Sequence, residues 1–163
     1  MPELIAYPVK TLSPIIAPTH SKPMLQLLIE EYQLDPHLDR IFYRTEINGR
    51  TYILITGRTT RYAFHKRFRE LGLPIPKRKL KSYGIVFEEK YVSNDVFVIT
   101  ANNNKQTLMN AEVVLPNAKG LLLLLEDAPE QYKKINQIMV HGLRNMGFGW
   151  IQIFWNNSTT III

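Results

Sequence analysis

The strongest chemical signal in this sequence is the basic segment between Arg58 and Lys81, which reads RTTRYAFHKRFRELGLPIPKRKLK. It holds nine lysines or arginines and a single acid, Glu70, so its net charge is +8, whereas the whole chain of 163 residues carries +6. The other 139 residues therefore hold 11 basic and 13 acidic side chains. A strongly basic segment on a mildly acidic body indicates a polyanionic partner.

Guanidinium and ammonium groups at this density neutralise phosphates and release counterions, which gives affinity for DNA or RNA regardless of sequence. Two tyrosines in or beside the segment offer rings on which unpaired bases could stack. The alternative is a solvated helix face, but such a face usually mixes charges of both signs. We therefore predict a nucleic-acid-binding surface made of Arg58, Arg61, Tyr62, Lys66, Arg67, Arg69, Lys77, Arg78, Lys79, Lys81 and Tyr83.

Glu88 and Lys90 offer a second chemistry, because they lie two residues apart late in a predicted strand. An acid and a lysine at this spacing resemble the second half of the PD-(D/E)xK nuclease signature, in which the pair flanks a metal and its attacking water. A nuclease would also need a divalent metal such as Mg²⁺ and a further carboxylate, for which the candidates are Glu46 and Glu70. We favour the simpler interpretation, an ion pair on a solvated strand worth about 0.2–1 kcal/mol.

The four histidines lack the spacing of metal ligands, so no metal site is predicted from them. His65 lies within the basic segment, where its neighbours are expected to lower its pKa. A neutral imidazole there could act as a general base on an RNA 2′-hydroxyl or simply form a hydrogen bond. Apart from the magnesium of the nuclease alternative, the sequence predicts no cofactor.

A third hypothesis is an assembly or adaptor protein without catalysis, whose basic surface binds an acidic protein. The absence of cysteine excludes disulfides and thiolate metal sites and favours a cytoplasmic location. An anionic membrane would attract the same charges, but the apolar side of the basic helix is expected to face the core, so no membrane partner is predicted. Homo-oligomerisation stays open.

The elements that position these residues follow from local patterns. The prolines of residues 1–20 predict an extended arm, followed by a single domain over residues 21–163. Asn48-Gly49 between two β-prone runs predicts a hairpin over residues 40–56 with a tight type I′ turn. Helices are expected over about residues 22–34, 61–71 and 127–147, the second capped by Thr59 or Thr60 with Phe64, Phe68 and Leu71 facing the core.

The remaining strands are expected in pairs. Residues 82–92 are predicted to pair with 96–101, and residues 111–115 with 120–126, while Asp127 and Glu130 form a capping box for the last helix. Residues 149–155 read as an interior strand, and the tail after them as an edge strand. The predicted class is α+β, with a predominantly antiparallel sheet of about six to eight strands and about three helices.

Overall fold

The computed structural model describes residues 3–18, 26, 29–30, 42–100, 103–141 and 147–162, without the side chains of Pro18, Ile99 and Thr107. In this part of the chain one α-helix has defined bounds, α2 (Gly57–Glu70), and two short 3₁₀ helices follow, η1 (Glu89–Tyr91) and η2 (Glu130–Lys134). The strands are β1 (Glu3–Thr11), β2 (Ile15–Pro18), β3 (Tyr43–Ile47), β4 (Arg50–Thr56), β5 (Ser82–Glu88), β6 (Val92–Thr100), β7 (Gln106–Val114), β8 (Lys119–Leu124), β9 (Gln137–Met139), β10 (Trp150–Ile153) and β11 (Thr159–Ile162).

The larger sheet contains eight strands in the order β3-β4-β5-β8-β1-β10-β9, with β11 also paired to β1. Every pairing recorded in it is antiparallel. β1 lies in the middle, with β8 along one edge and both β10 and β11 along the other. The fold is therefore α+β with a mostly antiparallel sheet, as predicted, but the described residues hold one α-helix with defined bounds where about three helices were expected.

The segment predicted as a Pro-rich arm supplies this central strand. Pro8 is tolerated there because its carbonyl, which accepts a hydrogen bond from Phe154 N at 2.9 Å, points to the edge shared by β10 and β11. A residue's N–H and C=O point to the same side of a strand, so the N–H that proline lacks would face this edge. The pairing with β11 ends at Ala6 and that with β10 begins at Val9, so the proline lies between the two partners.

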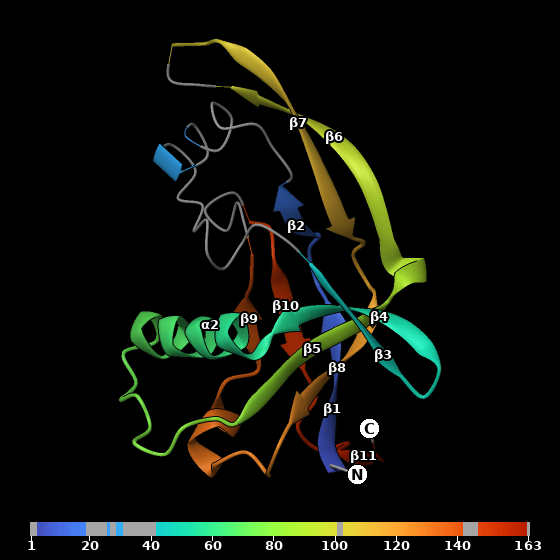
Figure 1. The fold of residues 1–163 in the computed structure, drawn as a ribbon. Helices are drawn as coiled ribbons and strands as arrows, with labels where there is room; N and C mark the ends of the chain where they lie inside the picture. The colour runs from blue at the N-terminus through green and yellow to red at the C-terminus, as the bar shows by residue number, and fades with distance from the viewer. Residues whose placement is uncertain are drawn as a thin grey trace.

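The smaller sheet has the order β2-β7-β6. Its two long strands form a hairpin that extends beyond the larger sheet (Figure 1). Met109 is buried on one side of this hairpin, whereas Val96, Val98 and Leu108 are exposed on the other. The turn predicted around Asn103 and Asn104 is present, while residues 101–102 lie outside the described part.

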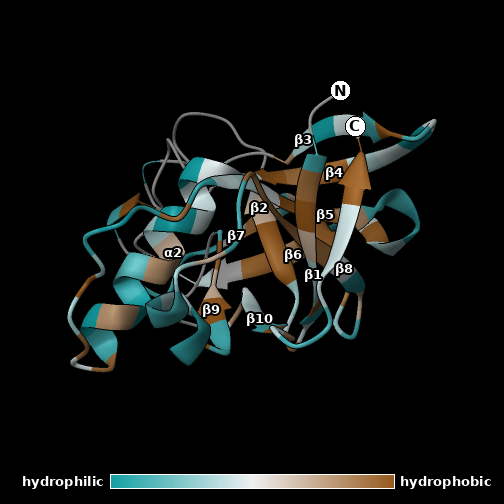
Figure 2. Cartoon of the chain, turned by 90° about the horizontal axis from the view of Figure 1, so that it is seen from below, coloured by the Kyte–Doolittle hydropathy of each residue, from teal (hydrophilic) through white to brown (hydrophobic). Residues whose placement is uncertain are grey.

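The main core lies between α2 and the larger sheet. Phe64 and Phe68 are buried under the helix and contact the ring of Tyr132 edge-on, at centroid distances of 5.7 and 5.4 Å. The strands of the larger sheet are largely hydrophobic, and much of α2 is hydrophilic (Figure 2). A smaller apolar cluster lies on the opposite face of the sheet and consists of Leu4, Ala6, Ile47, Val86 and Leu123.

The hairpin predicted around Asn48-Gly49 is confirmed. β3 and β4 pair in register from Tyr43↔Leu54 to Ile47↔Arg50, which leaves a two-residue turn. Asn48 and Gly49 have φ angles of 51° and 79°, and a type I′ turn requires positive values at both positions. Residues 40 and 41, the expected start of this hairpin, lie outside the described residues.

The last predicted helix is wrong. Residues 130–134 form the single 3₁₀ turn of η2, and the chain then enters β9. The three-residue spacing of Tyr132, Ile135 and Ile138 suggested a helix, but it also fits a 3₁₀ turn followed by a strand. From Ile138 to Val140 the buried positions alternate, as in a half-buried strand. The predicted capping box of Asp127 and Glu130 is also wrong, because the N-cap of η2 is Pro129, which makes no side-chain hydrogen bond.

Two predicted strand pairs are also wrong. β5 pairs with β4 and β8, while residues 93–95, predicted as a turn, belong to β6 and pair with β7. β7 and β8 flank the turn at Pro116-Asn117 but belong to different sheets. The interior position of β10 and the edge position of β11 agree with the prediction. The expected helix over residues 22–34 lies mostly outside the described residues.

Candidate nucleic-acid interface

The basic helix α2 is fixed at both ends. It begins four residues before the predicted start, because the side chain of Thr56 accepts a hydrogen bond from Thr59 N at 3.4 Å, whereas Thr59 and Thr60 are buried within the helix. Any side chain at Gly57 would collide with the Ser82 carbonyl, so the helix start lies directly against β5. At the other end Gly72 adopts a φ of 68° and the Leu73 N–H bonds to the Phe68 carbonyl, a Schellman motif.

The outward face of α2 carries most of its charge. Arg58, Tyr62 and Arg69 are exposed there, and Lys66 lies beside them half-buried. Arg61 and His65 are half-buried at the border of this face. Leu71, which was predicted to face the core, is 46% exposed because it caps the helix end instead of continuing the buried stripe.

Arg67 departs from the predicted interface. Its guanidinium carbon lies 5.1 Å from the centroid of the Trp150 ring in β10, a cation–π contact on the side of α2 that faces the sheet. Arg67 therefore belongs to the packing between α2 and β10 rather than to the outward face.

The loop after α2, residues 71–81, is anchored to the core. Leu80 is 1% exposed and packs in the main core, while its neighbours Lys79 and Lys81 are exposed. The Tyr132 hydroxyl donates to the Arg78 carbonyl at 3.4 Å, and Leu125 N donates to the Lys81 carbonyl at 2.8 Å. The loop thus presents its cations from a backbone held in place.

Glu126 neutralises part of this loop. Its carboxylate accepts a hydrogen bond from Arg78 at 3.0 Å and lies 3.6 Å from Lys81 Nζ. The hydrogen bond from Arg78 is the main reason why the pKa of Glu126 lies below its ordinary value, and Lys81 adds to the effect. Both cations are more than half exposed, so their attraction to Glu126 is screened and weak.

Six cations of the predicted surface remain without a carboxylate. Within the described ranges, no Asp or Glu oxygen lies within 4.0 Å of the charged groups of Arg58, Arg61, Lys66, Arg69, Lys77 and Lys79. We refer to these six residues together as the free basic surface. Positive charges that no neighbouring carboxylate neutralises favour an anionic partner over solvent alone.

His65 has a lowered pKa, as predicted, but for a different main reason. Burial is the largest cause, and the positive charges of Arg69 and Arg61 add to it. The lowered pKa favours the neutral imidazole, so His65 adds little to the positive charge of the interface.

Tyr83, which was predicted to belong to the nucleic-acid-binding surface, lies away from the cations of α2. It packs with the apolar cluster on the face of the sheet opposite α2, and its hydroxyl forms a 3.2 Å hydrogen bond with Thr45 Oγ1. Tyr62 lies on the outward face of α2 and is thus the tyrosine that remains among the cations.

The carboxylates of the nuclease alternative are not brought together. Glu88 and Tyr52 are paired neighbours and share one face of the sheet with Thr45, so the adjacent Glu46 points to the other face. Glu70 lies at the end of α2, which also packs on that other face. Across the described residues, no three His, Asp or Glu side chains are placed to hold a metal ion.

Glu88 and Lys90 instead form the ion pair that we favoured. Lys90 Nζ lies 3.2 Å from Glu88, which also accepts a hydrogen bond from Arg50 at 3.1 Å. The bond to Glu88 raises the pKa of Lys90, so this lysine is a charged partner and not a poised base.

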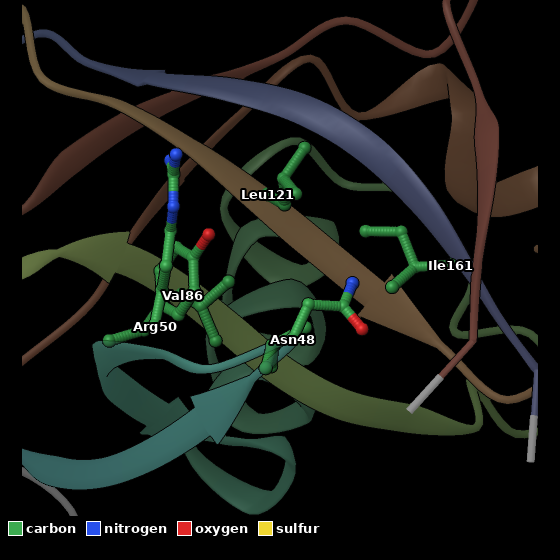
Figure 3. Close-up of a pocket in the computed structure, with 7 residues that line it drawn as sticks. Asn48, Arg50, Val86, Leu121 and Ile161 are labelled. Carbon is green, nitrogen blue, oxygen red and sulfur yellow. The ribbon is translucent and has the colours of Figure 1, made fainter.

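Arg50 also borders a groove on the face of the sheet opposite α2. The groove has a volume of about 280 Å³, with Val86 and Leu121 in its lining, and it continues into a second hollow of about 290 Å³ toward Lys119. Asn48 at the hairpin turn points across it toward Ile161 of β11 (Figure 3). Its apolar lining distinguishes this groove from the basic surface.

Sequence reasoning missed a polar hollow of about 600 Å³ beside η2. Its lining residues come from η2 and the link to β9, from β10 and from the turn that follows β10, so no local run in the sequence reveals them. The closest signal is the sequence FWNN at residues 154–157, two aromatic residues followed by two amides.

No helix in the described ranges is long and apolar enough to cross a membrane. Comparison with protein-family models found no family that matches this chain, and a search of curated proteins found no significant relative. The function therefore has to be inferred from the chain's own residues.

Proposed function

We propose that this protein binds nucleic acid, with the free basic surface contacting phosphates. The single observation that carries the proposal is the group of six cations on α2 and the following loop that have no carboxylate partner among the described residues. Each cation that contacts a phosphate releases condensed counterions, which drives association.

One further feature favours nucleic acid over an acidic protein, and another favours binding in general. Tyr62 is exposed between Arg58 and Lys66 and offers a ring on which a base can stack. The helix and the loop are both anchored to the core, so the cations lie on a pre-ordered surface that loses little conformational entropy on binding.

The test is fluorescence anisotropy with labelled single-stranded and duplex oligonucleotides across a series of KCl concentrations. Replacing Arg58, Arg69, Lys77 and Lys79 by alanine should weaken binding and flatten its salt dependence. Each lost contact should reduce the log–log slope by about 0.9 on duplex DNA and about 0.7 on single strands. The control replaces Lys105 in the β6–β7 turn and Lys119 beside the groove on the opposite face of the sheet, both exposed, and should leave the slope nearly unchanged.

Absence of binding to DNA and RNA at about 50 mM salt, where phosphate contacts are strong, would refute the proposal. The adaptor hypothesis would then lead, and the same four-residue variant should be compared with wild type in binding to acidic proteins. Equal loss of affinity in the control variant would also count against a local interface, since it would indicate attraction to net charge alone.

A further inference from the structure

The polar hollow beside η2 has the residue chemistry of a base-binding pocket. Amide side chains and aromatic rings from three separate segments meet there, namely Asn136, Gln152, Asn156, Asn157, Phe154 and Trp155. The volume of about 600 Å³ lies in the range of ligand pockets, roughly 300–1,000 Å³.

The four amides are available for a ligand. In the part of the chain that the structure describes, none of their side chains makes a hydrogen bond to another residue. Each amide carries two donors and an acceptor oxygen, and this pairing of donor and acceptor matches the edge of a nucleobase.

The aromatic wall of the hollow is rigid on one side and accessible on the other. Trp155 donates its indole N–H to the Ile135 carbonyl at 2.7 Å, and its ring contacts that of Tyr7 at a centroid distance of 4.9 Å. Phe154, which precedes Trp155 in the chain, is 36% exposed. Unpaired bases stack on exposed aromatic rings of this kind.

The charged groups of the hollow favour a neutral ligand group. Lys133 Nζ lies 3.4 Å from Glu130 and 3.6 Å from Asp127, so its charge is balanced inside the protein. A phosphate would gain no free cation there, whereas an uncharged base meets only amides, aromatic rings and a lysine that is already paired with carboxylates.

The hollow lies close to the loop that carries Lys77 and Lys79 of the free basic surface. η2 lies between them, because Tyr132 of η2 bonds to the Arg78 carbonyl of the basic loop while the neighbouring Lys133 lines the hollow. The loop and η2 lie next to each other at the lower end of the molecule (Figure 1).

We infer that this hollow holds an unpaired base of a nucleic acid strand whose phosphates lie on the free basic surface. The inference rests on the proposed function and deepens it, since it assigns single-stranded nucleic acid as the ligand. A base inside a duplex cannot enter the hollow, because its edge is paired and its faces are stacked.

The experiment compares two full-length variants with wild type in binding to labelled ten-nucleotide rA, rC, rU and dT strands and to a duplex. Asn136→Ala with Asn157→Ala should reduce differences among the homopolymers, and Phe154→Ala should weaken single-strand binding about tenfold. Both should leave duplex affinity and the salt slope unchanged. Asn94→Ala, an exposed amide on β6, is the matched control and should bind as wild type does.

Unchanged affinity of both variants for every single strand would overturn the inference while leaving the phosphate surface intact. Failure of wild type to bind any oligonucleotide would overturn it together with the proposed function. Amides and aromatic rings also bind sugars, so a neutral oligosaccharide is included as a competitor. If the oligosaccharide binds wild type but not Phe154→Ala, and nucleic acid does not displace it, the hollow is a glycan site and the inference is wrong.

Discussion

Tyr7 links the central strand to the segment before η2 through one hydrogen bond. Its hydroxyl donates to Asp127, which lowers the pKa of that carboxyl, and burial together with Asp127 raises the pKa of Tyr7 to about 12. A phenol with a raised pKa stabilises the fold fully below its unfolded value of about 10, and this contribution is lost as the pH rises toward 12.

Tyr7→Phe is expected to destabilise the protein by about 1 kcal/mol at pH 8, because the bond to an exposed carboxylate is lost. The difference should shrink above pH 10 and change sign near pH 11, because the unfolded state of wild type gains stability by ionising its tyrosine while the folded state keeps the phenol protonated. Urea unfolding at pH 8, 10, 11 and 12 measures this. A difference that stays constant with pH would show that Tyr7 titrates no differently in the folded and unfolded states.

Leu80 decides whether the basic loop is held to the body. Leu80→Ala should cost about 2–5 kcal/mol of unfolding free energy, because the side chain is 1% exposed in the main core. Ile75→Ala in the same loop is the matched control, since Ile75 is exposed, and should change stability by less than about 0.5 kcal/mol. Chemical denaturation of both variants tests this, and equal effects would contradict the anchoring role of Leu80.

At the scale of elements, α2 depends on its cap. Thr56→Ala should destabilise the protein by about 1 kcal/mol, because the side chain of Thr56 accepts the hydrogen bond from Thr59 N at the helix start. Thr56→Ser keeps the hydroxyl and should stay close to wild type. Thermal unfolding followed by circular dichroism gives the comparison, and a serine variant as unstable as the alanine variant would assign the effect to packing of the lost methyl group.

Elements whose signals are local could be predicted from the sequence. The hairpin at Asn48-Gly49 was predicted correctly, because two residues that tolerate positive φ determine its turn. The prediction that Phe64 and Phe68 of α2 face the core was also correct, because both residues follow the helical period. The prediction of a final helix was wrong, because the spacing of Tyr132 and Ile138 fits both a helix and a turn that leads into a strand.

Features that depend on distant partners could not be predicted in the same way. Arg67 follows the basic pattern of its neighbours, but only the position of β10 brings it onto Trp150. Glu126 pairs with Arg78 across 48 residues, and nothing in either local sequence indicates that pairing. The position of the basic segment could therefore be predicted from the sequence. Only the folded structure shows which of its cations are paired with a carboxylate or a ring and which are not.

At the scale of the whole molecule, the free basic surface should make stability depend on salt. Raising KCl from about 0.05 to about 0.5 M should increase the unfolding free energy by about 0.5–1 kcal/mol, because ions screen repulsion among the six cations. The variant that lacks Arg58, Arg69, Lys77 and Lys79 should show a smaller increase in the same urea titrations. An equal increase in both proteins would attribute the effect to general salting-out rather than to this surface.

The central position of β1 has a consequence for how the molecule is made. Residues 3–11 leave the ribosome long before their partners β8, β10 and β11, the nearest of which begins at Lys119. At about 5–20 residues per second, the strand waits roughly 5–20 s for its first partner. During synthesis its alternating apolar residues, among them Leu4, Tyr7 and Val9, must stay in solution or be shielded by a chaperone.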